Sequence, residues 1–224
     1  CWLYANKHKG DFILRIEDTD LDRTCDIYTQ NIFDTLNWLG LSWTEGPYYQ
    51  TKRLSIYNNL LYNLLLEKKA YRCYCTKQRL EYLRSIQLKN KKKPKYDGYC
   101  RDIIEILNKP YVIRFKNPED GNVHFFDGVY GDIIINNNEI DDLILSRSDG
   151  IPTYNFVAVV DDIEMKITHV IRGADHITNT ARQINIYNAL GFPYPKFYHI
   201  PIILNDIGKR LSKRLNSASV SYFY

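Results

Sequence analysis

The sequence predicts an α/β fold that is interrupted by a segment of different character. Two observations support this prediction. Strand-like stretches followed by amphipathic helices occur towards both ends of the 224-residue chain, a pattern typical of a parallel sheet covered by helices. Between about residues 71 and 150 the composition shifts to cysteines, clustered lysines and prolines, which indicates an inserted module.

The first part of the chain is predicted to contain one strand and two helices. At residues 12–16 apolar side chains alternate, which favours a strand with one buried face. Helices are predicted at 26–39 and 53–68 from their apolar stripes, with Gly40 ending the first of them. The stretch 41–51 is predicted to be an ordered loop. Acidic residues follow the strand at its carboxyl end, where open α/β sheets bind ligands.

The α/β pattern returns towards the end of the chain. Residues 168–172 are predicted to form a strand and 178–190 a helix that ends at Gly191. The hydrophobic stretch 197–204 then predicts a further strand. Inside the insertion, 111–115 is also strand-like.

Composition narrows the class of protein. Hydrophobic residues make up 45% and charged residues 25% of the chain, which is typical of a soluble globular protein. No apolar run approaches the roughly 18 residues that span a bilayer, so no membrane association is expected. The net charge of +4 permits an anionic partner. Five cysteines, an odd number, favour a reducing compartment, either the cytoplasm or an organelle interior.

Four motifs carry chemistry: RIEDTD at 15–20, YNFVAVVDD at 154–162, VIRGADH at 170–176 and GKRLSKR at 208–214. Singly, each has a plain interpretation, such as a solvated turn or a general basic patch. An arginine suits a carboxylate ligand because its planar fork makes two parallel hydrogen bonds. A glycine followed by several cations suits a polyphosphate. In this order and spacing the set resembles the catalytic domain of glutamyl-tRNA synthetases.

This resemblance implies a fold, a domain order and a reaction. The fold would be a Rossmann-like parallel-sheet core, with its first part at 1–70 and its second part at 154–224. An inserted α+β module at 71–153 would bind the acceptor stem. The enzyme, acting as a monomer, would use ATP and Mg²⁺ to convert L-glutamate into glutamyl-adenylate, and would then transfer the glutamyl group to the 3′ end of tRNA(Glu).

The resemblance also assigns site residues. Glu17 in RIEDTD would bind the ammonium group of the amino acid, and Tyr154 and Arg172 would contact the same substrate. Asp175 would contact the ATP ribose. Lys213 would be the catalytic lysine, stabilising negative charge on the α-phosphate of ATP as pyrophosphate leaves.

A metal site is also predicted in the insertion. Cys73 and Cys75 form a C-x-C pair, and Cys100 follows after 24 intervening residues, which favours a structural Zn²⁺. The resemblance leaves two candidates for the fourth ligand, Asp102 and Tyr96. A lysine cluster at 89–95, flanked by tyrosines, would grip the acceptor end of tRNA, and a solubilising loop is the alternative.

The resemblance has departures and rivals. Ala174 stands where many members of the family carry an acidic residue, and Ala158 stands where some members carry asparagine. Arg210 replaces the first lysine of the family's KLSKR motif. The ATP-cradling motif expected before Cys1 and the anticodon-binding domain are not in the sequence, so we expect a fragment that activates glutamate poorly.

One rival function is that of the truncated paralogue that glutamylates queuosine in tRNA(Asp), although the intact 211–214 loop and the cysteine spacing favour the synthetase. A non-catalytic zinc-containing tRNA-binding module is the other.

Overall fold

The computed structural model describes residues 1–19, 26–204 and 207–208. Within them the α-helices are α1 Trp2–Lys7, α2 Asp26–Trp38, α3 Leu54–Leu66, α4 Lys77–Lys89, α5 Tyr154–Glu164 and α6 Ile177–Leu190. Short 3-10 turns are η1 Gln50–Arg53, η2 Asn137–Glu139 and η3 Ala174–His176. The strands are β1 Ile13–Ile16, β2 Glu45–Tyr49, β3 Ala70–Cys73, β4 Val112–Phe115, β5 Asn122–Asp127, β6 Gly131–Asn136, β7 Ile144–Ser146, β8 His169–Gly173 and β9 Lys196–Ile200. No helix in these ranges is long and apolar enough to cross a membrane.

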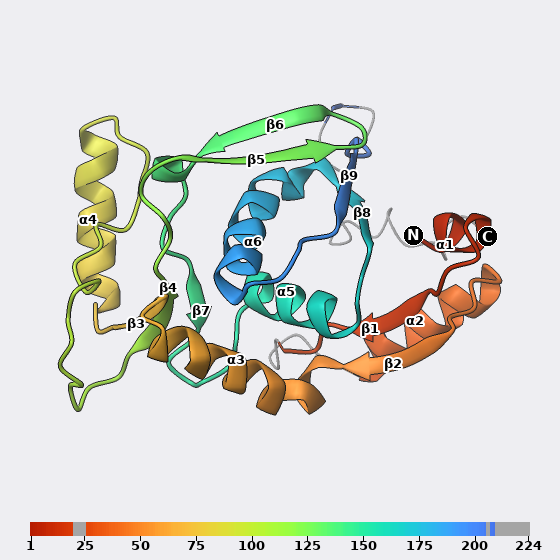
Figure 1. Cartoon of the computed structure of the whole chain (residues 1–224), viewed down its shortest axis with the longest axis horizontal. Helices are drawn as coiled ribbons and strands as arrows, with labels where there is room; N and C mark the ends of the chain where they lie inside the picture. The colour runs from red at the N-terminus through yellow and green to blue at the C-terminus, as the bar shows by residue number, and fades with distance from the viewer. Residues whose placement is uncertain (20–25, 205–206, 209–224) are drawn as a thin grey trace.

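The strands form three sheets in a mixed α/β fold (Figure 1). The largest has the order β6-β5-β9-β8, in which β9 runs parallel to both β5 and β8. Strands β1 and β2 form a parallel pair, and β3, β4 and β7 form an antiparallel sheet. The predicted strand at 12–16 and the predicted helices at 26–39, 53–68 and 178–190 are confirmed with small changes at their ends. Gly191 ends α6 with a φ of +77°, as predicted.

Two predictions about strands need correction. The stretch 41–51 contains β2, which pairs with β1 (Ile13 opposite Glu45), and is not only a loop. Its Gly46-Pro47 sequence hides the strand because both residue types are rare in strands. Gly46 is required here, because a Cβ atom would lie 2.3 Å from Leu14 O. The second correction concerns the strand predicted at 197–204: the observed strand, β9, ends at Ile200.

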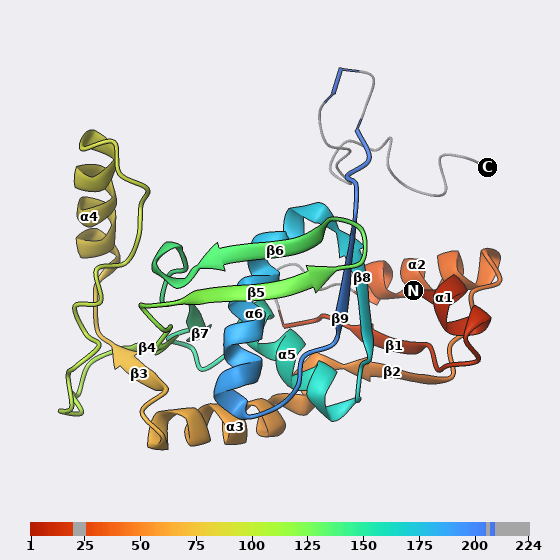
Figure 2. The same cartoon turned by 45° about the horizontal axis from the view of Figure 1, so that its top comes forward.

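Helix α6 is the centre of the molecule, as the two views show (Figures 1 and 2). One of its faces packs on the large sheet, where Ala181 and Ile184 meet Phe125 and Phe197 in a buried cluster. The opposite face carries Ile186 and Tyr187 into the main core, which α3, α5 and the β3-β4-β7 sheet complete. A helix buried on both sides is a rigid support, so residues on α6 are well placed to fix a site.

Strands from both sides of the expected boundary at residue 153 share one sheet. The β5-β6 hairpin lies within 71–153, yet β5 pairs with β9 of the second core segment (Asp127 opposite Phe197). The rest of this segment, with β3, α4 and β4, lies at one end of the molecule (Figure 1). Asn185 of α6 joins the two parts, because its Nδ2 donates to Asn117 Oδ1 (2.8 Å) and Asn137 Oδ1 (2.9 Å).

Candidate functional site

Arg172 lies in β8, and neutral groups hold its guanidinium. Its Nη2 donates to Thr180 Oγ1 (2.7 Å) and Gln183 Oε1 (2.8 Å) on α6, and its Nε donates to His199 Nε2 on β9 (3.2 Å). Burial lowers its pKa against the opposing effects of Tyr154 and Asp162, but a guanidinium stays charged at neutral pH. Among the described residues it makes no ion pair, so this charge is available to an anionic ligand.

Tyr154 is the first residue of α5, and the charges of Arg172 and Glu17 both act on it. Its side chain reaches the surface, with 39% of the residue exposed. Burial raises the pKa of the Tyr154 phenol; the positive charge of Arg172 opposes this, and the negative charge of Glu17 adds to it. The ring of His176, which follows β8, lies 5.9 Å from the Tyr154 ring, and Arg15 at the end of β1 pairs with Asp162 on α5, the helix that Tyr154 begins. Three segments that are distant in sequence therefore meet at one site.

Glu17 follows β1 and is held towards α5 by its neighbour Arg15. The Arg15 guanidinium lies 3.7 Å from Glu17 Oε1 and 2.9 Å from Asp162 Oδ1 on α5. Burial raises the pKa of Asp162, and the adjacent Arg15 opposes that shift. The Glu17 side chain is about half exposed, at 49%, so its carboxylate remains accessible to a ligand.

The next residue fixes the backbone of this segment. Asp18 is buried, and its two carboxylate oxygens accept from Thr51 N (2.9 Å) and Thr51 Oγ1 (2.5 Å) at the start of η1. Hydrogen bonds to a buried carboxylate are strong, so they fix the loop after β1 against the end of β2. Glu17 therefore sits on an anchored turn.

Of the two residues predicted to contact ATP, the structure describes Asp175 but not Lys213. Asp175 lies in η3, directly after β8, with its Oδ2 3.6 Å from His176 Nε2. A Cβ atom on Gly173 would lie 2.5 Å from Asp175 Oδ1, so the glycine lets this carboxylate fold over the strand end. The centre of the His176 ring is 5.9 Å from that of the Tyr154 ring, which places η3, the turn that carries Asp175, beside Tyr154. Lys213 lies outside the described residues.

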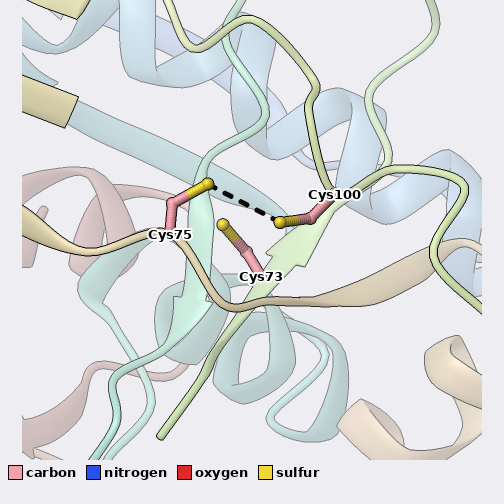
Figure 3. Close-up of side chains that lie close together, drawn as sticks. All are labelled: Cys73, Cys75 and Cys100. Carbon is pink, nitrogen blue, oxygen red and sulfur yellow. Dashed lines mark hydrogen bonds between the residues drawn. The ribbon is translucent and has the colours of Figure 1, made fainter. Parts of the chain in front are cut away.

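Three thiols come together in the insertion (Figure 3). Cys73 ends β3, Cys75 follows it, and Cys100 approaches from a loop; their sulfur atoms all lie within 4.8 Å of one another. The Cys75 and Cys100 sulfurs are 3.6 Å apart. Tetrahedral zinc with Zn–S bonds of about 2.3 Å requires sulfurs about 3.7 Å apart, so the donor set and its spacing fit Zn²⁺.

A phenol is the nearest additional donor to the thiols. The hydroxyl of buried Tyr96 lies 3.3 Å from Cys73 Sγ and 3.6 Å from Cys75 Sγ, and it accepts from Cys100 N (2.9 Å). Burial raises the pKa of Cys73, but hydrogen bonds from Tyr96 and other donors outweigh it and lower this pKa. The Asp102 side chain is 91% exposed and pairs with Lys116 (3.2 Å). Asp102 is therefore not in the cluster, whereas Tyr96, the alternative, touches it.

The lysine cluster begins at the end of α4 that is farther from the thiols, and its loop then returns towards Tyr96. Lys89 ends α4, and the following lysines lie in an exposed loop up to Lys95. The loop is fixed at its end, since Lys95 Nζ donates to Asn138 O (2.8 Å) and Gln87 bonds both the N and the O of Lys95. Exposed cations on a fixed loop suit a polyanion.

A protein-family model, tRNA synthetases class I (E and Q), catalytic domain, matches residues 1–223. The chain belongs to this family. It is 59% identical over 223 residues to a glutamate–tRNA ligase of Legionella pneumophila (strain Paris), a match covering 99% of this chain and 47% of the relative. It is 55% identical over 220 residues to glutamate–tRNA ligase 2 of Coxiella burnetii (strain Dugway 5J108-111), with 98% and 47% covered.

Solved structures of the family agree with the fold. The chain superposes with a TM-score of 0.85 and 35% identity on a glutamate tRNA ligase from Elizabethkingia meningosepticum CCUG26117 in complex with its amino acid, covering 95% of this chain and 47% of that one. The glutamate–tRNA synthetase from Elizabethkingia anophelis gives a TM-score of 0.86 at 35% identity, with 95% and 48% covered. The chain thus spans about half the length of the relatives it matches.

Within this synthetase family fold, the sequence-predicted residues fall into two groups, and their roles stay predictions. Glu17, Tyr154, Arg172 and Asp175 lie around one end of β1 and β8, and the three thiols form their own cluster. Sequence reasoning missed the residues that support Arg172: His199, Asp127, Thr180 and Gln183. No local pattern marks them, because each gains its role only through strand pairing and helix packing.

Proposed function

We propose that this chain is the catalytic part of a glutamate–tRNA ligase. In the first step a carboxylate oxygen of L-glutamate attacks the α-phosphate of ATP, and pyrophosphate leaves. In the second step the terminal ribose hydroxyl of tRNA(Glu) attacks the acyl carbon, and AMP leaves. The observation that supports this proposal most directly is the guanidinium of Arg172, which is held by three neutral acceptors and has no ion pair among the described residues.

The amino-acid side of the site suits an acidic substrate. Arg172 would bind the side-chain carboxylate of glutamate, because it forms no ion pair among the described residues and its planar fork matches a carboxylate. The Tyr154 hydroxyl, beside it, would add a neutral hydrogen bond. Glu17, whose carboxylate is accessible, would bind the ammonium group. Glutamine, with a neutral side-chain amide, would leave the partly buried Arg172 without a carboxylate in contact, and this disfavours it.

The nucleotide side rests on the sequence match and on the place of Asp175. Asp175 would accept hydrogen bonds from the ATP ribose, and Lys213 would hold the α-phosphate. Mg²⁺, bound with ATP, would neutralise part of the triphosphate charge. The protein groups act here by position and charge rather than by covalent chemistry.

The insertion would bind the acceptor end of tRNA. Its exposed lysines at 89–95 would contact phosphates. We also propose that Cys73, Cys75 and Cys100 hold a structural Zn²⁺, with the Tyr96 phenol as the fourth donor in preference to Asp102. When bound, the metal would join β3 to the loop that carries Cys100 and thereby stiffen the insertion.

Arg172→Gln in the full-length protein tests this function. The amide keeps hydrogen-bond donors but removes the charge, so kcat/KM for glutamate in ATP–pyrophosphate exchange should fall roughly a hundredfold or more, while KM for ATP changes little. Charging assays with tRNA(Glu) and tRNA(Asp) separate this function from queuosine glutamylation. Wild-type protein that binds tRNA but shows no glutamate-dependent exchange would instead support the non-catalytic RNA-binding module.

A further inference from the structure

A buried aspartate–histidine pair lies directly behind Arg172. His199 in β9 and Asp127 at the end of β5 both have fully buried side chains, and His199 Nδ1 is 2.6 Å from Asp127 Oδ2. The backbone N–H of His199 donates to the same carboxylate oxygen (3.1 Å). Since Arg172 and His199 are direct partners in the β8-β9 ladder, the imidazole sits beside the guanidinium. The pair is therefore built into the parallel sheet.

The hydrogen bonds define the tautomer of His199. Arg172 has only donors, and its Nε lies 3.2 Å from His199 Nε2, so Nε2 must carry a lone pair. The Thr180 hydroxyl also reaches Nε2 (2.9 Å). The ring proton is therefore on Nδ1, where it is donated to Asp127. Burial lowers the pKa of His199 against the opposing effect of Asp127, which is consistent with a neutral ring.

Asp127 is itself fixed. Its Oδ1 accepts from Val129 N and Tyr130 N, both at 3.0 Å, in the turn that joins β5 to β6. Burial raises its pKa, but these backbone hydrogen bonds and the one from His199 outweigh that effect and lower it. Asp127 thus remains a carboxylate that can only accept, and it forces the His199 proton to stay on Nδ1.

We propose that Asp127 and His199 are positioning residues for Arg172 and thereby set the affinity of the site for the substrate carboxylate; this rests on the proposed glutamate-activating function. A neutral imidazole acceptor orients the guanidinium plane without cancelling its charge. A carboxylate in the same place would pair with Arg172 and compete with the substrate. The pair is a part of the specificity machinery that does not touch the substrate.

Two His199 variants separate positioning from simple packing. In full-length protein, His199→Leu should raise KM for glutamate roughly tenfold or more, while KM for ATP stays within about threefold, because the hydrogen bond to a charged group is lost. His199→Gln offers an amide oxygen to Arg172 and an amide N–H to Asp127, so it should stay within about threefold of wild type. The matched control is His124→Leu, which removes an exposed His–Asp pair on the same hairpin, 2.7 Å from Asp132, and should change neither constant.

Asp127→Asn tests the tautomer itself. The amide oxygen takes the place of Oδ1, where it keeps the Val129 and Tyr130 N–H groups and can accept the backbone N–H of His199, which lies 3.3 Å away. The amide nitrogen then faces His199 Nδ1, and the ring proton must move to Nε2. That proton then points at Arg172 Nε–H, so two donors oppose each other and KM for glutamate should rise as in His199→Leu. The ¹⁵N shifts of the His199 ring, assigned by their loss in His199→Gln, should show Nδ1–H in wild type and Nε2–H in the variant.

Each outcome decides the proposal. A folded His199→Leu or Asp127→Asn variant with the wild-type KM for glutamate overturns it, as does an equal rise in KM for ATP. If His199→Leu does not fold, Asp127→Asn and His199→Gln decide. A wild-type ring protonated on Nε2 overturns it as well. This spectrum needs no activity, so it remains decisive even if the wild-type protein shows no glutamate-dependent exchange, a result that would refute the proposed function instead.

Discussion

Arg53 and Arg172 both carry a guanidinium into the region around α5, but the fold gives them different partners. Arg53, at the end of η1, donates from Nε to Asp161 Oδ1 at 2.8 Å, and Asp161 is fully buried. Tyr57 OH (2.8 Å) and Gln50 Nε2 (3.0 Å) complete the hydrogen bonds of that carboxylate. Arg172 receives only neutral acceptors from its surroundings.

The difference shows how one fold separates a structural cation from a binding cation. A buried charge is costly unless a counter-charge and hydrogen bonds compensate it. Asp161 compensates Arg53 within the fold, so that pair has little left to offer a ligand. Around Arg172 the hydrogen bonds come from neutral groups, and the nearby charge of Asp162, which pairs with Arg15, acts on it without forming an ion pair among the described residues. An incoming carboxylate can therefore complete this second cluster as Asp161 completes the first.

Asp161→Asn should give the largest effect on stability. The amide keeps the shape but removes the fully buried negative charge that pairs with Arg53 and lies 3.6 Å from Arg15, so the free energy of unfolding should fall by about 3 kcal/mol. Urea unfolding of the full-length protein measures the loss. Asp149→Asn is the control, since that carboxylate is 52% exposed beside Arg147 and should contribute less than about 1 kcal/mol. An Asp161→Asn protein as stable as the control would remove the contrast between the two arginines.

The thiols of the insertion are the opposite case to Arg172. When deprotonated they are anions and would bind a cation, whereas Arg172 is a cation that would bind an anion. Tyr96→Phe should weaken zinc binding roughly 10–100-fold, since it removes the hydroxyl that touches Cys73 and Cys75. Asp102→Asn, on an exposed side chain, should leave zinc affinity unchanged. Competition with a chromophoric chelator measures both. The reverse ranking would return Asp102 to the ligand set and show that the loop around Cys100 rearranges on metal binding.

The sequence predicts those features whose signals are local. The alternation at 12–16 and the apolar stripes at 26–39 and 53–68 gave strand and helices because periodicity is set by neighbouring residues. The thiol cluster was visible from its C-x-C pair. Strand β2 was missed because its Gly46-Pro47 step suppresses the local signal, and only its pairing with β1 makes it a strand.

The support of the candidate site could not be predicted in this way. Asp127 and His199 are 72 residues apart and meet only because β5 pairs with β9, a parallel pairing across the expected domain boundary. Asn185 likewise looks like an ordinary helix residue until its amide bridges Asn117 and Asn137. Such residues acquire their roles through long-range topology, whereas Glu17, Tyr154 and Arg172 were found because they stand in motifs that resemble a known family.

Arg172→Gln should have the smallest effect on stability, and it tests the comparison most directly. Removing this charge relieves the cost of partly burying a cation that has no ion pair among the described residues, while the amide still donates to one of the three acceptors that Arg172 uses, so the two effects should nearly cancel. The free energy of unfolding should stay within about 1 kcal/mol of wild type in the same urea titration. Added glutamate should stabilise the wild-type protein but not the variant. A loss as large as that of Asp161→Asn would mean that Arg172 is compensated within the fold and is a structural cation like Arg53.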